Sequence, residues 1–548
     1  MLRNVLANYL NKVKEREFDV PLSLLLPSMG FYDVHYTHGN VEFGRDFIAK
    51  HCDNGVETQY SFQSKAGSID QSAWRSDIQP QLLEAVLNSL DHPSFDPALP
   101  HQLVFVSTGN LSGNAAAGFR KLNAKIEGQY RETPIIFWGA NNLIDFLLDS
   151  GLTTVHPGSA SGFAEYAQFF VLYSRALEGT LTDREIEDYS RLWIDVEVEP
   201  LRRLLWCSIE SEVLSQQCLE RGRLYESIYI HLARLRVLVW LSYQYWASNT
   251  RHRRMLMSLF SDGLQRLRGL CTRYVDAFRA VWMEHRDLIR SVSTSMLLTE
   301  YPVHCSRLLD VTGLLYFATE AEADRQKLAG FVVDFADREP GARHPIGDRY
   351  AVSVVLAVLV LLDQGHVDEV RALVRRLTVW VCDRYQNGIG LGGLEADEKE
   401  ETQTILGEVF DIFELSNHRS SFLASVLIDL SAFLGDAQFY RAVVNDIKAC
   451  NIVCEYWQPR DTEGVCRVEA EDVLSYPALG YRDDLSSFYA FDVAEHMGDE
   501  CGTFAFIDAF GTGAAVALML LLRDRYFPKL WPELARNYVQ AGAMSSRD

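Results

Sequence analysis

Short runs of β-branched and aromatic residues alternate with helical patterns over roughly the first 157 residues of the chain. The runs predict strands at 32–37, 45–51, 58–65, 103–107 and 135–138. Apolar residues at helical spacing predict helices before, between and after these strands, at 2–16, 20–28, 75–90, 113–126 and 141–149. This order predicts an α/β domain over residues 1–157, with a mixed sheet flanked by helices.

The pattern changes after this domain, where long helical segments replace the alternating runs. Small residues at 158–163 predict a linker at the boundary. Further helices are predicted at 223–246, 349–383, 402–417, 420–434, 436–449 and 512–524. Breaks at 336–347 and 385–401 divide these helices. We therefore expect a large all-α region, with a first part at 158–340 and a second part at 341–548.

Acidic residues outnumber basic ones by 74 to 52, which gives the 548-residue chain a formal charge of −22. The charge is uneven, because residues 1–157 carry −5 and the remaining residues carry −17. A surface this acidic disfavours non-specific coating of nucleic acid. Any contact with nucleic acid is therefore expected at a local site in the N-terminal domain.

The apolar runs are too short to predict a membrane span. The best of them, at 351–362, has twelve residues, whereas a spanning helix needs about 20. It is typical of a buried core helix. The first helix lacks the cleavage site of a signal peptide, and the ten cysteines form no tight framework. We expect a cytoplasmic protein with no membrane contact.

A carboxylate, an amide and an ammonium group are predicted to meet at one end of the sheet. Asp46 lies at the start of one predicted strand, and Gln63 and Lys65 lie near the end of the next. Residues two apart on a strand share a face, so Gln63 and Lys65 point to the same side. Asp53-Asn54-Gly55 is typical of a hairpin turn, and antiparallel pairing across it brings Asp46 close to both residues.

These three groups suit the hydrolysis of a phosphodiester. Mg²⁺ (or Mn²⁺) prefers oxygen ligands and keeps several waters, so Asp46 would bind it together with the Gln63 oxygen or a backbone carbonyl. The metal acidifies a bound water and offsets the charge of the phosphate. Lys65 would orient or deprotonate that water, or stabilise the developing negative charge.

The segment 42–46 (EFGRD), followed by 63–67 (QSKAG), resembles the Mrr-like branch of the PD-(D/E)XK restriction-endonuclease superfamily. In that branch the second motif is often Q-x-K. The resemblance extends to the strand at 103–107 and to the strand at 135–138 with its following helix. It covers residues 1–157 and not the helical region. It implies a restriction-endonuclease-like fold, whose core order agrees with the elements predicted above.

The resemblance implies that Asp46 is the metal-binding acid, that Gln63 occupies the acid position of the second motif and that Lys65 is the catalytic lysine. Glu42, four residues before Asp46, is a candidate extra metal ligand. Gln63 departs from the superfamily pattern, because an amide is a poorer Mg²⁺ ligand than a carboxylate. Metal affinity is therefore expected to depend on Asp46 and Glu42.

Two further residues are candidates for contacting the substrate. Gln79 lies on the helix after the motif, where it would orient a phosphate or Lys65. His35 lies on the first strand, from which it would approach the phosphate.

The expected function is a metal-dependent endonuclease, with DNA as the expected substrate. Fusion to a large helical region suits the effector of a prokaryotic anti-phage defence system, with the helices as sensor, regulator or assembly region. Protein partners or a second copy of the chain are expected to bind there. Two alternatives remain open: a modification-dependent restriction enzyme, which the acidic helical region disfavours, and a non-catalytic nuclease-fold scaffold in a multi-protein complex.

Overall fold

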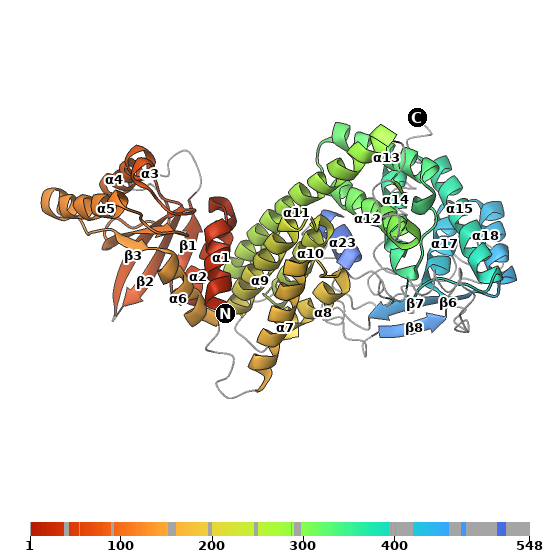
Figure 1. Cartoon of the computed structure of the whole chain (residues 1–548), viewed down its shortest axis with the longest axis horizontal. Helices are drawn as coiled ribbons and strands as arrows, with labels where there is room; N and C mark the ends of the chain where they lie inside the picture. Colours follow the sequence, from red (N-terminus) through yellow and green to blue (C-terminus); the bar gives the residue numbers. More distant parts are fainter. Residues whose placement is uncertain are drawn as a thin grey trace. The chain divides into compact units, whose positions relative to one another are not determined.

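The structure is a computed structural model of the chain (Figure 1). The described residues are 2–37, 43–53, 55–88, 92–151, 160–195, 200–245, 250–285, 288–289, 297–393, 396, 401, 420–459, 473–477 and 512–521. The chain divides into two units, the first formed by Met1–Thr180 with Leu192–Arg221 and the second by Leu181–Arg191 with Gly222–Asp548.

A five-stranded mixed sheet lies at the centre of the first unit. Its strands are β1 (Tyr32–Tyr36), β2 (Phe47–Asp53), β3 (Val56–Lys65), β4 (His101–Ser107) and β5 (Ile136–Trp138). They are adjacent in chain order. β1, β2 and β3 pair antiparallel, whereas β4 runs parallel to β3 and β5 runs parallel to β4. The predicted mixed sheet is therefore confirmed.

Helices cover both faces of this sheet (Figure 1). On one face, the ring of Phe62 packs 5.5 Å from the rings of Phe31 and Trp138, and Trp138 packs against Phe146. The elements on this side are α1 (Leu2–Lys12), α2 (Glu15–Ser28) and α6 (Ala140–Gly151).

The opposite face packs Leu103 and Phe105 of β4 into a buried apolar cluster with Trp74, Ile78 and Leu82. The elements on this side are α3 (Gln71–Ala73), the π-turn η1 (Trp74–Ile78), α4 (Gln79–Leu87), α5 (Asn114–Lys125) and the π-turn η2 (Ile126–Tyr130). The alternation of apolar side chains along the strands therefore supplies a core on each side of the sheet.

The first unit also contains α7 (Ala160–Glu178) and α9 (Pro200–Glu220). α9 packs against α2, and Lys12 Nζ of α1 lies 2.5 Å from Glu220 Oε1. The linker predicted at 158–163 is partly wrong, because α7 already begins at Ala160. Alanine has the highest helix propensity, and the helical pattern of the following residues extends the helix toward this point.

The second unit is mostly helical (Figure 1). Its α8 (Asp183–Asp195) ends in the first unit. The other helices are α10 (Leu224–Tyr245), α11 (Thr250–His285), α12 (Leu297–Phe317), α13 (Glu322–Arg338), α14 (Ala351–Asp363), α15 (Val367–Gln386), α17 (Phe422–Phe433), α18 (Ala437–Ala449) and α23 (Thr512–Leu521), with 3₁₀ turns η4 (Pro340–Ala342) and η5 (Asp348–Tyr350). α14 is buried from Ala351 to Leu362, which confirms the predicted core helix. Among the described residues, no helix has the length and apolarity needed to cross a membrane.

The expectation of an all-α region after the first domain is wrong in one place. A small sheet joins β6 (Ser420–Ser421), β7 (Val453–Pro459) and β8 (Val473–Pro477). β7 and β8 pair antiparallel, and their valine, tyrosine and tryptophan residues favour extended backbone. The helix predicted at 402–417 lies outside the described residues.

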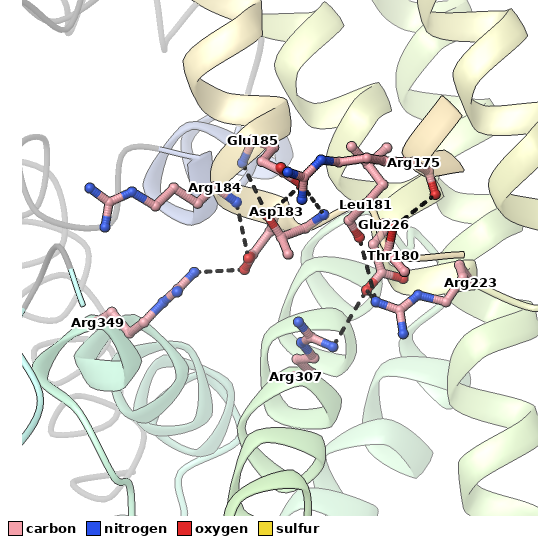
Figure 2. Close-up of polar contacts among 11 residues, drawn as sticks. Arg175, Thr180, Leu181, Asp183, Arg184, Glu185, Arg223, Glu226, Arg307 and Arg349 are labelled. Atoms are coloured by element: carbon pink, nitrogen blue, oxygen red, sulfur yellow. Dashed lines mark hydrogen bonds and ion pairs between the residues drawn. The ribbon is translucent and has the colours of Figure 1, made fainter. Parts of the chain in front are cut away.

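Ion pairs to two buried carboxylates connect parts of the second unit, and Figure 2 shows them. Arg349 Nη2 lies 2.6 Å from Asp183 Oδ2, and both side chains are only 10% exposed. Nearby, Glu226 Oε1 lies 2.8 Å from Arg223 Nη2 and 3.6 Å from Arg307 Nη1. Because buried charges need opposite partners, these pairs fix the start of α8 against η5 and α10 against α12.

Candidate active site

Asp46 lies between two strands, immediately before β2. Phe47 pairs with Phe62, so Asp46 lies just beyond the paired residues of β2, at the end of β3 that carries Gln63. The Asp46 N–H donates to the Phe62 carbonyl at 2.7 Å, and Asp46 Oδ2 accepts from the Ser64 N–H at 2.6 Å. The structure therefore brings together the first two of the predicted site residues.

A tight turn before Asp46 is packed against α4. Gly44 has a φ of 68°, and a Cβ atom at this position would lie 2.6 Å from the Gln81 carbonyl oxygen. Glycine is therefore required here for both its backbone conformation and its lack of a side chain. These constraints place the loop that carries Asp46 directly on the helix that carries Gln81.

Arg45 strengthens the same attachment. Its side chain is buried, and Nη2 donates to the Ala85 carbonyl and, at 2.5 Å, to the Asn88 carbonyl. Burial lowers the pKa of Arg45 to about 10, so the group stays protonated at neutral pH. A cation at the C-terminal end of α4 also suits the helix dipole. Arg45 therefore acts as an anchor for the neighbouring Asp46.

Gln63 is 2% exposed and belongs to a chain of hydrogen bonds. Gln63 Nε2 donates to Gln81 Oε1, and Gln81 Nε2 donates to Asp77 Oδ1 at 2.5 Å. Gln63 Oε1 is buried and has no hydrogen-bond partner among the described residues. An acceptor oxygen buried without a donor is the atom that a cation would satisfy.

Lys65 is two residues further along β3 and contacts an acid of α2 that the sequence reasoning missed. Gln63 contacts α4, on the opposite face of the sheet, so these contacts do not place the two side chains on the same side as expected. Lys65 Nζ lies 3.1 Å from Oε1 of Glu15, the first residue of α2. The Lys65 side chain is 18% exposed and that of Glu15 is 42% exposed. No spacing in the sequence indicates this contact, because it depends on how α2 packs across the end of β3.

The other predicted site residues have different places. Glu42 lies outside the described residues. Gln79 is the first residue of α4, but Gln81, two positions later, is the residue that contacts Gln63. His35 Nε2 lies 3.0 Å from both Asp33 Oδ1 and the Ser94 hydroxyl. These contacts do not connect His35 to the other predicted residues.

The described residues contain no cluster of three or more histidine, cysteine, aspartate or glutamate side chains that would hold a metal ion. Among the described residues, the donors for a cation at this site are the Asp46 carboxylate and the Gln63 carbonyl oxygen, completed by water. This donor set fits Mg²⁺ or Mn²⁺, which take oxygen ligands and keep several waters. It does not fit a closed structural zinc site, which uses four nitrogen or sulfur ligands.

Comparisons of the chain with protein-family models, with curated proteins and with solved structures found no match.

Proposed function

We propose that residues 1–157 form a metal-dependent endonuclease domain that hydrolyses phosphodiester bonds, with DNA as its substrate. The observation that carries the proposal is the position of the Asp46 carboxylate, which accepts from the Ser64 N–H between Lys65 and Gln63, whose buried oxygen has no partner among the described residues. A carboxylate, a neutral oxygen ligand and an ammonium group at one sheet end are what metal-assisted phosphodiester hydrolysis requires. The choice of DNA follows from the family resemblance.

Each side chain has a role that its surroundings support. The Asp46 carboxylate and Gln63 Oε1 would hold Mg²⁺ or Mn²⁺, which supplies an acidified water and offsets the phosphate charge. Lys65 carries the positive charge that interacts with the phosphate oxygens or orients the attacking water. Glu15 positions the Lys65 ammonium group through the 3.1 Å contact. Arg45 and Gly44 hold the Asp46 loop on α4.

The helical region is proposed to regulate this activity, as in an effector of an anti-phage defence system, through a protein partner or a second copy of the chain. This role rests on the family resemblance and on fold-level analogy. The charge of −17 after residue 157 supports protein contacts rather than DNA reading. It therefore disfavours the modification-dependent restriction enzyme.

A plasmid-nicking assay with the full chain tests the proposed function. Supercoiled plasmid is incubated with Mg²⁺ or Mn²⁺ and with wild type or Asp46→Ala. Cleavage is expected from wild type alone, and a chelator should abolish it. Asp53→Ala removes an exposed acid from the other end of the same strand and should leave cleavage unchanged. An RNA transcript added in parallel tests the choice of DNA.

Two results would contradict the proposal. Equal cleavage by wild type and Asp46→Ala would remove Asp46 from the site, and cleavage in excess chelator would exclude a metal-dependent reaction. The non-catalytic scaffold predicts intact plasmid with every variant and with either metal.

A further inference from the structure

We propose that Asp77 and Gln81 are positioning residues whose hydrogen bonds orient the Gln63 amide so that its oxygen serves as the metal ligand. This inference rests on the proposed function, because it concerns the same metal site. The Gln63 amide stands at a position where the superfamily that the sequence resembles usually has a carboxylate. A carboxylate presents oxygen in either orientation, whereas an amide has one oxygen and one NH₂ group.

The direction of the hydrogen bonds follows from the chemistry of the last group in the chain. An ionised carboxylate only accepts hydrogen bonds, so Asp77 requires the NH₂ group of Gln81. Gln81 must then present its oxygen to Gln63. Gln63 in turn must present its NH₂ group to Gln81, which leaves Gln63 Oε1 buried without a partner among the described residues.

Backbone packing and the burial of Gln63 both support this arrangement of the two amides. The Gly44 turn contacts the Gln81 backbone, so the Asp46 loop and the Gln81 side chain are held in one place. The Gln63 side chain is 2% exposed, so water is not freely available to stabilise the reversed amide. The orientation of the Gln63 amide is therefore determined by Asp77, whose exposed carboxylate contacts Gln81 and not Gln63 itself.

Replacement of Gln63 by glutamate gives a sharp test, because a carboxylate cannot donate to Gln81. In Gln63→Glu, the Gln81 amide lies between two carboxylates, the one introduced at position 63 and that of Asp77. Its NH₂ group can donate to one of them, so its oxygen must face the other. Adding Asp77→Asn resolves this conflict, since an asparagine NH₂ group can donate to Gln81 Oε1. In the Gln63 background, the same Asp77→Asn change removes the group that determines the amide orientation.

The experiment measures Mn²⁺ binding to the full chain by titration calorimetry, without substrate. Asp77→Asn is expected to weaken Mn²⁺ binding at least threefold in the Gln63 background and to strengthen it at least threefold in the Gln63→Glu background. A mere loss of negative charge would weaken binding by the same factor in both backgrounds. Glu127→Gln, which removes an exposed acid from the other π-turn, η2, serves as the charge control and should show no such reversal.

Circular dichroism confirms that each variant is folded before titration. An Asp77→Asn effect of the same sign and factor in both backgrounds would overturn the positioning role. Gln81→Leu should abolish the difference between the two backgrounds, and a difference that persists would also overturn it. If Asp46→Ala binds Mn²⁺ as tightly as wild type, the proposed metal site itself fails, which is a separate result from failure of the positioning role.

Discussion

Replacement of Gly44 by alanine should destabilise the sheet of the first unit and displace Asp46. Two effects add at this position. A non-glycine residue in the left-handed region costs about 1–2 kcal/mol. The new Cβ would lie 2.6 Å from the Gln81 carbonyl oxygen, so the turn and α4 must move apart. Overpacking of this kind costs about 1–3 kcal/mol, which gives a total loss of about 2–5 kcal/mol.

Gly55 provides a matched control. Its φ of 82° is similar to that of Gly44, but a Cβ atom there has no heavy atom within 4 Å among the described residues. Gly55→Ala should therefore lose only the backbone contribution of about 1–2 kcal/mol. The difference between the two variants isolates the contact between the Gly44 turn and α4.

Native-state hydrogen exchange, followed by mass spectrometry of peptides from β3 and α4, measures these losses locally. This assay suits a chain of two units, where a single unfolding transition is not expected. Faster exchange should appear in both peptides for Gly44→Ala and should exceed that for Gly55→Ala. Equal exchange in the two variants would refute the packing of this turn on α4.

Three further outcomes concern charged groups. Asp183→Ala removes the carboxylate that lies 2.6 Å from the buried Arg349 guanidinium. Urea unfolding should show the free energy of unfolding of the second unit lowered by about 3–5 kcal/mol. Asp324→Ala breaks an exposed ion pair and should lower it by less than about 1 kcal/mol. Burial raises the pKa of Glu401 to about 7, so the folded state holds this proton more tightly than the unfolded state. The free energy of unfolding should therefore fall by about 3 kcal/mol as the pH rises from about 4.5 to 7. Thermal unfolding at several pH values should show that Glu401→Gln removes this pH dependence. Glu15→Gln should slow plasmid cleavage about tenfold with a stability change below about 1 kcal/mol, because the Lys65 contact is partly exposed; an unchanged rate would exclude a positioning role.

The sheet domain was predictable because its information is local. Each strand from β1 to β5 is a short β-branched or aromatic run, and the runs at 32–37 and 58–65 differ from the observed strands by one or two residues at an end. The small sheet of β7 and β8 was missed because its strands lie in a part of the chain whose pattern is otherwise helical. The local sequence pattern predicts each element separately, whereas the pairing of β7 with β8 depends on tertiary packing.

The site was predictable in its motif and not in its surroundings. Asp46 and Gln63 come together because they flank one hairpin, and the hairpin is encoded in the sequence. Gln79 was chosen on the following helix instead of Gln81 because helix phase is needed to decide which residue faces the sheet. The π-turn at Trp74–Ile78, closed by the Gln79 N–H donating to the Trp74 carbonyl, adds a residue to one turn and shifts that phase. No sequence rule reveals such a turn in advance.

The most direct test of the proposed catalytic site is the rate of plasmid cleavage by Lys65→Ala at saturating Mn²⁺. The variant should bind Mn²⁺ as wild type does, because Lys65 is not a ligand. Its cleavage rate should fall by at least about a hundredfold. Lys50→Ala removes a lysine from β2 that pairs with Asp33 at 3.3 Å and should cleave at the wild-type rate. A wild-type cleavage rate from Lys65→Ala would contradict the assignment of this site as the catalytic centre.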